Sequence, residues 1–219
     1  MAQVIRLLPS YRDRRHAGQV LADKLSTLPS GPMLVLAIPN GGLAVAAPIA
    51  ESLHAQLDAV IVRKLQIPYN TEAGFGALTS FGKMILNEPL VRQLGLTGKD
   101  LDLVRKNTEK QIADRKRAYA GLIGHSNPSK KHTILVDDGL ASGYTMLAAV
   151  DSLKDFRPSA ITVAVPTASA GAAEKVGAAV DRLVCPRIES GAVFAVADAY
   201  EDWYDVPDSE VIDILKHFR

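Results

Sequence analysis

The sequence predicts an α/β fold with a mainly parallel central sheet flanked by helices, and two patterns carry this prediction. First, several apolar runs have strand length and no polar alternation, as at 33–38 and 133–136, which is typical of strands buried on both faces. Second, helical patterns follow these runs, and alternating strands and helices indicate a parallel sheet. The composition agrees, since 47% of the 219 residues are hydrophobic and 22% are charged, as in ordinary globular proteins.

The overall charge and the single cysteine argue against several classes of protein. A formal net charge of +1 gives no general affinity for nucleic acids or membranes. Cys185 is the one cysteine, which excludes an internal disulfide and fits a reducing compartment. No apolar run approaches the roughly 20 residues of a membrane span, and residues 1–10 lack the apolar core of a secretory signal. We therefore expect a cytoplasmic protein with no nucleic-acid and no membrane partner.

The first elements form a helix and a strand–helix–strand unit. Residues 17–28 have helical spacing, and we interpret the basic cluster before them, Arg12, Arg14 and Arg15, as a solvated first turn. Strands at 33–38 and 57–62 enclose a helix at 43–53. The turn Pro39-Asn40-Gly41-Gly42 opens that helix, a layout that binds phosphate. Arg63 and Lys64 are expected at the carboxyl end of the second strand, where open α/β sheets bind ligands.

The middle of the chain predicts a loop, a small ribbon and a long helix. Residues 66–81 are too long and too rich in glycine for a mere connector, and 75–79 would pair with 83–86 as an antiparallel ribbon. A short helix is expected at 87–95. Thr97 would cap a charged helix at 99–122, whose thin apolar stripe would pack on the core or on a second subunit. Its basic residues alternate with acids, which favours a solvated face over nucleic-acid binding.

The stretch at 133–145 carries the strongest chemical signal. A strand at 133–136 ends in Asp137-Asp138, and a turn of small residues and hydroxyls leads into a helix at 146–156. Backbone N–H groups at the start of a helix suit a phosphate. The carboxylates suit ribose hydroxyls or Mg²⁺, so the stretch predicts a site for a phosphorylated sugar. A receiver-type or phosphohydrolase-like domain is the alternative, but a receiver needs further acids near its first strand, and 33–38 has none.

The last third adds two strands, a helix and an aromatic tail. A strand at 160–165, a helix at 169–177 and a strand at 181–185 complete the alternation. We interpret Cys185 as a buried structural thiol. The tail carries Tyr200, Trp203 and Tyr204 among acids, which either stack on a planar base or anchor the tail. Asp208 or Ser209 would cap a helix at 210–218.

The order of strand, two acids, four loop residues, glycine, any residue and threonine resembles the 5-phosphoribosyl-1-diphosphate (PRPP) motif of type I phosphoribosyltransferases. Ala141-Ser142 stands where many members carry Thr-Thr or Asp-Thr. The Asp-Arg-Arg segment, the turn at 39–42, residues 62–64, the loop at 72–76 and the Tyr-Glu-Asp tail extend the resemblance over nearly the whole chain. They look like predicted phosphoribosyltransferases of unsettled substrate.

The resemblance implies an organisation and an activity. Residues 1–219 would form a single phosphoribosyltransferase-like domain, with hood elements from 66–86 and 194–219 and a long helix at 99–122. The activity would be transfer of the 5-phosphoribosyl group from PRPP to a nitrogenous acceptor, a nucleobase or related heterocycle, with Mg²⁺ as cofactor and diphosphate as leaving group. The alternative is a PRPP- or nucleotide-binding regulator without transferase activity. A homodimer is compatible with either role.

The resemblance also implies roles for individual residues. Ribose and phosphate contacts would come from Asp137, Asp138, Gly139, Leu140, Ala141, Ser142, Gly143, Tyr144 and Thr145. Diphosphate contacts would come from Pro39, Asn40, Gly41, Gly42, Arg63 and Lys64. Lys64, Asp137 and Asp138 are the candidate catalytic residues, and the two acids are direct or indirect Mg²⁺ ligands.

Two positions depart from the pattern. Asn40 stands where a basic residue is expected, so the turn brings no charge to the diphosphate. Ala141 stands where purine-type enzymes place an acid, which argues against an ordinary 6-oxopurine salvage enzyme.

Overall fold

A five-stranded parallel sheet forms the centre of the protein in a computed structural model that describes residues 10–68, 70–119, 121–191 and 194–219. Its strand order is β2-β1-β6-β7-β9. The strands are β1 (Met33–Ala37), β2 (Gln56–Ala59), β6 (His132–Val136), β7 (Ala160–Ala164) and β9 (Arg182–Val184). All four pairings are parallel, so the predicted α/β class is confirmed.

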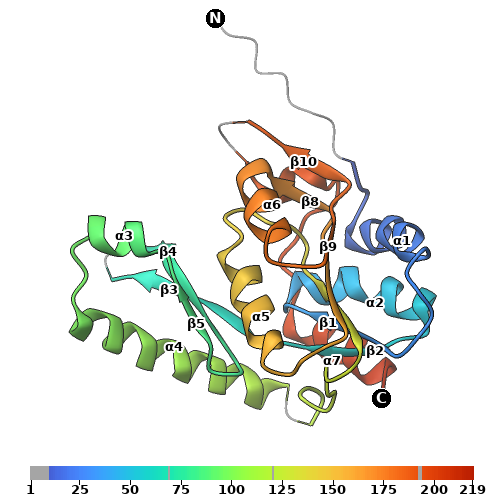
Figure 1. The fold of residues 1–219 in the computed structure, drawn as a ribbon, viewed down its shortest axis with the longest axis horizontal. Coiled ribbons are helices and arrows are strands. Elements are labelled where there is room, and N and C mark those ends of the chain that lie inside the picture. Colours follow the sequence, from blue (N-terminus) through green and yellow to red (C-terminus); the bar gives the residue numbers. More distant parts are fainter. Residues whose placement is uncertain (1–9, 69, 120, 192–193) are drawn as a thin grey trace, which may run out of the picture.

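Helices cover both faces of this sheet (Figure 1). Along β1, Val35 and Ala37 belong to one apolar cluster, while Leu34 and Leu36 belong to another, because successive strand residues point to opposite faces. The first cluster includes the helices α1 (Arg14–Leu25), α2 (Gly41–Leu53) and α7 (Asp208–His217). The second includes α5 (Tyr144–Lys154) and α6 (Ala170–Gly177). This double burial explains why the strand sequences are unbroken apolar runs.

A second, antiparallel sheet projects to one side of the central sheet (Figure 1). It consists of β3 (Val62–Ile67), β4 (Asn70–Thr79) and β5 (Met84–Leu86), and the helices α3 (Glu88–Gln93) and α4 (Gly98–Ala118) follow it. We call residues 62–118 the hood arm. The predicted ribbon is confirmed, since Gly76 pairs with Leu86 and Leu78 with Met84. Buried Thr79 and Ser152 join the arm to α5 through a 2.8 Å hydrogen bond between their hydroxyls.

The predicted strand at 57–62 is wrong at its end. β2 stops at Ala59, and the chain enters the hood arm at Val62, so Arg63 and Lys64 lie inside β3 and not beyond a strand of the parallel sheet. Val60 and Ile61 at the change of direction are buried. The apolar run continues through the residues that connect the two sheets, so the sequence pattern does not reveal where the first strand ends.

The predicted loop at 66–81 is mostly strand. β3 and β4 occupy nearly all of it, with irregular pairing around Gln66. A Cβ at Gly76 would lie 2.3 Å from the carbonyl oxygen of Ile85, so this glycine allows two strands to approach closely. Tyr69, within this range, lies outside the described residues.

Helix ends show one confirmed cap and one error. Thr97 caps α4 as predicted, in a reciprocal pair with Asp100. Asp208 and Ser209 do not cap the last helix. Its cap position is Pro207, which makes no side-chain hydrogen bond, and the Asp208 carboxylate points to other partners.

The small elements near the tail are β8 (Thr167–Ser169), β10 (Arg187–Glu189) and a 3-10 turn, η1 (Val196–Ala199). Cys185 is half-buried and not fully buried as predicted. Burial raises the pKa of its thiol to about 11, which disfavours the reactive thiolate. Among the described residues, no helix is both long and apolar enough to cross a membrane.

Candidate functional site

The acid pair and the turn after it lie at the carboxyl end of β6, in the middle of the parallel sheet. β6 ends at Val136, Asp137 and Asp138 follow, and α5 begins at Tyr144. Gly143 precedes α5 with a φ of 81°, a left-handed conformation that strains other residues. The turn therefore presents the N-terminal backbone of α5 at the sheet edge where ligands bind.

Two adjoining cavities form one cleft here. The smaller, about 440 Å³, is lined by all of residues 137–145 together with Lys64, Gly74 and Gly76 of the hood arm. The larger, about 690 Å³, is lined by Pro39, Asn40, Gly41, Arg63, Lys64, Asp137 and Asp138 among others. Lys64, Asp137, Asp138 and Thr145 line both cavities. Every predicted site residue except Gly42 therefore lines at least one of the two cavities.

The turn at 39–42 packs directly against the acid pair. Its Pro39–Asn40 peptide bond is cis. A Cβ at Gly41 would lie 1.9 Å from an Asp138 carboxylate oxygen, and one at Gly42 would lie 2.9 Å from the carbonyl oxygen of Val136. The two glycines are therefore required by the neighbouring strand end, in addition to any role toward a ligand.

The two acids differ in their surroundings. Asp138 Oδ2 accepts a 2.9 Å hydrogen bond from Arg14 Nε, which makes an ion pair. Desolvation, reinforced by the Asp138 charge, holds the pKa of Asp137 well above its ordinary value. The pair therefore combines a carboxylate matched by a cation with a carboxyl group that retains its proton more readily.

Arg14 is a site residue that the sequence reading missed. Its side chain is 4% exposed, so the interpretation of the basic cluster as a solvated turn is wrong for Arg14. It holds for Arg12 and Arg15, whose side chains are 65% and 63% exposed. The Arg14 guanidinium lies 3.9 Å from the ring centroid of Trp203. The nearby aromatic tail was visible in the sequence, but nothing local linked it to Arg14.

The aromatic tail is anchored on the acid pair. Tyr200 is buried, and its hydroxyl donates a 2.6 Å hydrogen bond to the carbonyl oxygen of Asp138. Arg14 Nη1 donates to the carbonyl oxygen of Tyr204 at 2.8 Å. Anchoring thus accounts for Tyr200, whereas Trp203 is 39% exposed and lines the larger cavity.

Asn40 is bound to distant parts of the chain. Its Nδ2 donates to the carbonyl oxygen of Val206 at 2.8 Å and to the Asp208 carboxylate at 2.9 Å. Its Oδ1 accepts a 3.0 Å hydrogen bond from the hydroxyl of Tyr119, at the end of α4. The same Asp208 carboxylate pairs with Arg115. A polar network therefore connects the turn, the long helix and the tail.

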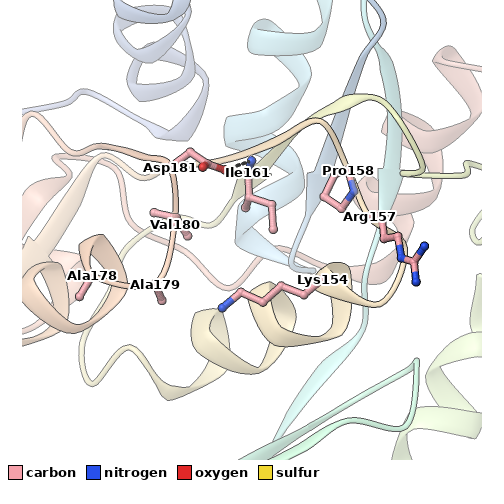
Figure 2. A pocket seen from close by; sticks show the side chains of 8 residues that line it. All are labelled: Lys154, Arg157, Pro158, Ile161, Ala178, Ala179, Val180 and Asp181. Atoms are coloured by element: carbon pink, nitrogen blue, oxygen red, sulfur yellow. Dashed lines mark hydrogen bonds between the residues drawn. The ribbon is translucent and has the colours of Figure 1, made fainter.

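A separate cavity of about 370 Å³ lies near the start of β7, at the opposite end of the sheet (Figure 2). Its cations, Lys154 and Arg157, point away from each other in Figure 2. Its acid, Asp181, accepts a 2.7 Å hydrogen bond from the backbone N–H of Ile161. This cavity contains none of the predicted site residues.

Comparisons with known proteins point to one family. A model of the phosphoribosyl transferase domain matches residues 82–200. Rv0571c of Mycobacterium tuberculosis H37Rv, provisionally named a phosphoribosyl transferase, is 30% identical over 205 residues, which are 94% of this chain and 46% of that protein. The bifunctional protein PyrR of Corynebacterium diphtheriae is 30% identical over 135 residues, 61% of this chain and 53% of PyrR. The chain thus spans about half the length of these curated relatives.

A solved structure matches almost the entire chain. The crystal structure of TT1426 from Thermus thermophilus has a TM-score of 0.80 and 32% sequence identity. The match covers 95% of this chain and 98% of TT1426. The fold of this chain, including the central sheet and the hood arm, is therefore similar to that of TT1426.

Proposed function

Because the chain belongs to the phosphoribosyl transferase family, we propose that it transfers the 5-phosphoribosyl group of PRPP to a nitrogenous acceptor and releases diphosphate. The observation that carries this proposal is the shared cleft, in which the turn at 139–145, the acid pair, the turn at 39–42 and Lys64 meet. The acceptor is a nucleobase or a related heterocycle. Residues 1–219 act as one domain, and the hood arm covers the cleft.

The smaller cavity receives the 5′-phosphate and the ribose. Backbone N–H groups of 141–145 bind the phosphate, with hydroxyls from Ser142 and Thr145. The helix dipole of α5 and the left-handed Gly143 favour an anion at this point. Asp137 and Asp138 bind the ribose hydroxyls, since both line the cavity beside the turn.

The acid pair can provide some of the oxygen ligands that Mg²⁺ needs, and the bound substrate must provide others. Asp137 and Asp138 provide carboxylate oxygens, which Mg²⁺ prefers. Within the described part of the chain, no group of three or more His, Cys, Asp or Glu side chains is placed to hold a metal. The remaining ligands would be water and oxygens of PRPP itself. A bound Mg²⁺ would supply positive charge beside the diphosphate.

The reaction exchanges one bond at C1 of the ribose for another. The bond from C1 to the diphosphate oxygen breaks with its electron pair on the diphosphate, and a nitrogen lone pair of the acceptor forms the new bond. Lys64, which lines both cavities, lies between the ribose end and the diphosphate end. It stabilises the negative charge that develops on the leaving group.

Ala141 restricts the acceptor. It is exposed, lines the smaller cavity and has no group that transfers a proton. The acceptor nitrogen must therefore lose its proton to solvent or to the diphosphate, or carry none. This favours a pyrimidine-like or other nitrogen heterocycle over a 6-oxopurine.

The test measures diphosphate from purified protein, PRPP and Mg²⁺ with a panel of bases and heterocyclic amines. We expect one acceptor class to release diphosphate in an amount equal to the new nucleotide. Ala141 also favours a second candidate, a PRPP-binding regulator. That candidate predicts PRPP binding by calorimetry with no acceptor-dependent release, and a chain that binds no PRPP would contradict both.

A further inference from the structure

The diphosphate end of the proposed site lacks a charge that its own turn would be expected to supply. In PRPP most of the negative charge is on the diphosphate, and Asn40 in the turn at 39–42 is neutral. Nearby carboxylates increase the need for cations, since Asp137, Asp138 and Asp205 line the same cavity. Arg14 lines this cavity but is paired with Asp138, and the other lining cations, Arg63, Lys64 and Arg115, belong to the hood arm.

Arg115 of α4 is such a cation. It lines the larger cavity together with Asn40, Gly41 and Lys64. Its side chain is 23% exposed and pairs with Asp208, while Nη1 also donates to the hydroxyl of Tyr119 at 3.1 Å. Asp208 and Tyr119 also hold the Asn40 amide, together with the carbonyl oxygen of Val206. One shared network thus fixes the neutral turn residue and a guanidinium close together.

A second guanidinium, that of Arg63, lies in the same region, and one of its N–H groups has no hydrogen-bond partner among the described residues. Arg63 lines the larger cavity with Arg115, and both line an adjoining cavity of about 410 Å³. Its Nε is buried and has no hydrogen-bond partner in the described part of the chain. Burial and the Arg115 charge lower the pKa of Arg63. Two arginines side by side, one with an unsatisfied N–H, form an arrangement that a multivalent anion would stabilise.

We infer that Arg115 supplies the charge that Asn40 does not, and that it binds the diphosphate of the donor beside Arg63 and Lys64. Its planar fork of N–H donors suits phosphate oxygens. Asp208, Tyr119 and Asn40 are positioning residues that hold the guanidinium at the turn. The inference rests on the proposed function, because the proposed donor sets which anion enters the cleft.

The experiment measures binding of three ligands by calorimetry: PRPP with Mg²⁺, diphosphate with Mg²⁺, and ribose 5-phosphate. For Arg115→Gln we expect affinity for PRPP and diphosphate to fall about 10- to 100-fold, the equivalent of one charge-assisted hydrogen bond. Affinity for ribose 5-phosphate should change less than about twofold, because that ligand has no diphosphate. Arg115→Lys keeps the charge but loses the planar set of N–H donors. Its affinity for PRPP and diphosphate should lie between those of the wild type and Arg115→Gln.

Arg117→Gln is the matched control. Arg117 lies on the same helix, its side chain is 74% exposed, and it pairs with Asp114. Binding of all three ligands should equal that of the wild type. A thermal melt of each variant establishes that the fold is retained.

The decisive variant is a charge relocation, Asn40→Lys combined with Arg115→Gln. If Arg115 replaces a missing turn cation, the double variant should recover at least about tenfold in diphosphate affinity over Arg115→Gln. Equal loss for all three ligands in Arg115→Gln, or no loss, overturns the inference while the proposed function stands. A wild-type chain that binds neither PRPP nor diphosphate overturns both.

Discussion

Asp138 belongs to the proposed donor site and also makes contacts that hold distant segments of the chain. Its carboxylate pairs with Arg14, its carbonyl oxygen accepts from Tyr200, and its Oδ2 leaves no room for a side chain at Gly41. A ligand that binds Asp138 therefore contacts a group that already holds the first helix and the tail. Binding and stability are coupled at this residue.

A double-mutant cycle measures that coupling. Asp138→Asn leaves the buried Arg14 charge without its carboxylate, which should lower the free energy of unfolding by about 1–3 kcal/mol. Arg14→Gln should cost a similar amount. We expect the double variant to cost less than the sum of the two, as residues in one ion pair are not additive. Urea unfolding of the four proteins checks this, and strict additivity would show that the pair contributes no coupling.

Lys64 offers a second prediction at the residue scale. It lines both cavities from β3, so Lys64→Ala should weaken PRPP binding by about 10- to 100-fold through loss of one charge-assisted contact. Binding of a nucleoside monophosphate, which lacks the diphosphate, should barely change. Equal weakening of both ligands would make Lys64 a structural residue.

At the scale of elements, the hood arm is the part whose attachment matters for function. Lys64, Gly74 and Gly76 of its strands line the cleft, while its link to α5 includes the buried hydrogen bond between Thr79 and Ser152. The Thr79 hydroxyl also accepts from the backbone N–H groups of Phe81 and Lys83. One hydroxyl thus connects the β4–β5 turn to the body of the protein.

Thr79→Val removes this hydroxyl with little change in volume. We expect amide hydrogen exchange in 75–86 to become faster, by a factor of about 5 to 30 for a loss of about 1–2 kcal/mol. The control is Thr108→Val, because the Thr108 hydroxyl donates a hydrogen bond to the carbonyl oxygen of Val104 within its own helix. Equal exchange in wild type and Thr79→Val would mean that this hydroxyl does not hold the arm, and that apolar packing and the ion pairs of Lys83 with Asp151 and Asp155 hold it instead. PRPP with Mg²⁺ should slow exchange in the arm if it closes over the donor.

At the scale of the whole molecule, the start of the described chain lies against the aromatic tail, beside the site. Tyr11 and Tyr200 form a short parallel bridge, and their rings lie 5.8 Å apart. The Tyr11 hydroxyl donates a 2.9 Å hydrogen bond to the carbonyl oxygen of Pro166, after β7. The sheet, the first helix and the tail are therefore joined by buried phenols that must stay neutral.

This junction makes stability depend on alkaline pH. Burial, followed by the Cys185 charge, raises the pKa of Tyr11 from 10.0 to about 12, and burial also raises the pKa of Tyr200. A raised folded-state pKa means that the stabilisation is complete below pH 10 and is lost as the pH rises toward 12. For Tyr11 the loss should be about 2–3 kcal/mol. Urea unfolding at pH 8, 10 and 11.5 should show a shallower decline for Tyr11→Phe than for the wild type, and identical declines would refute the assignment.

The sequence by itself determined the α/β class, the alternation along the sheet and the turn at 137–145. These features are local, because strand burial, helical spacing and the position of acids after a strand are visible in consecutive residues. It could not locate the passage from β2 into β3, where Val60 and Ile61 continue the apolar run. An apolar run reports burial but not which sheet buries it.

Only the tertiary structure decided which charges surround the acid pair and the turn. Arg14 reaches Asp138 across 124 positions, and Asn40 reaches Asp208 across 168. In the sequence Arg115 is one more cation on a solvated helix, and only its partners, Asp208 and Tyr119, set it apart. The sequence around a charged residue looks the same whether its side chain faces water or a buried partner. Its surroundings are set by segments that approach only when the chain packs, and the buried environment then decides what that charge contributes.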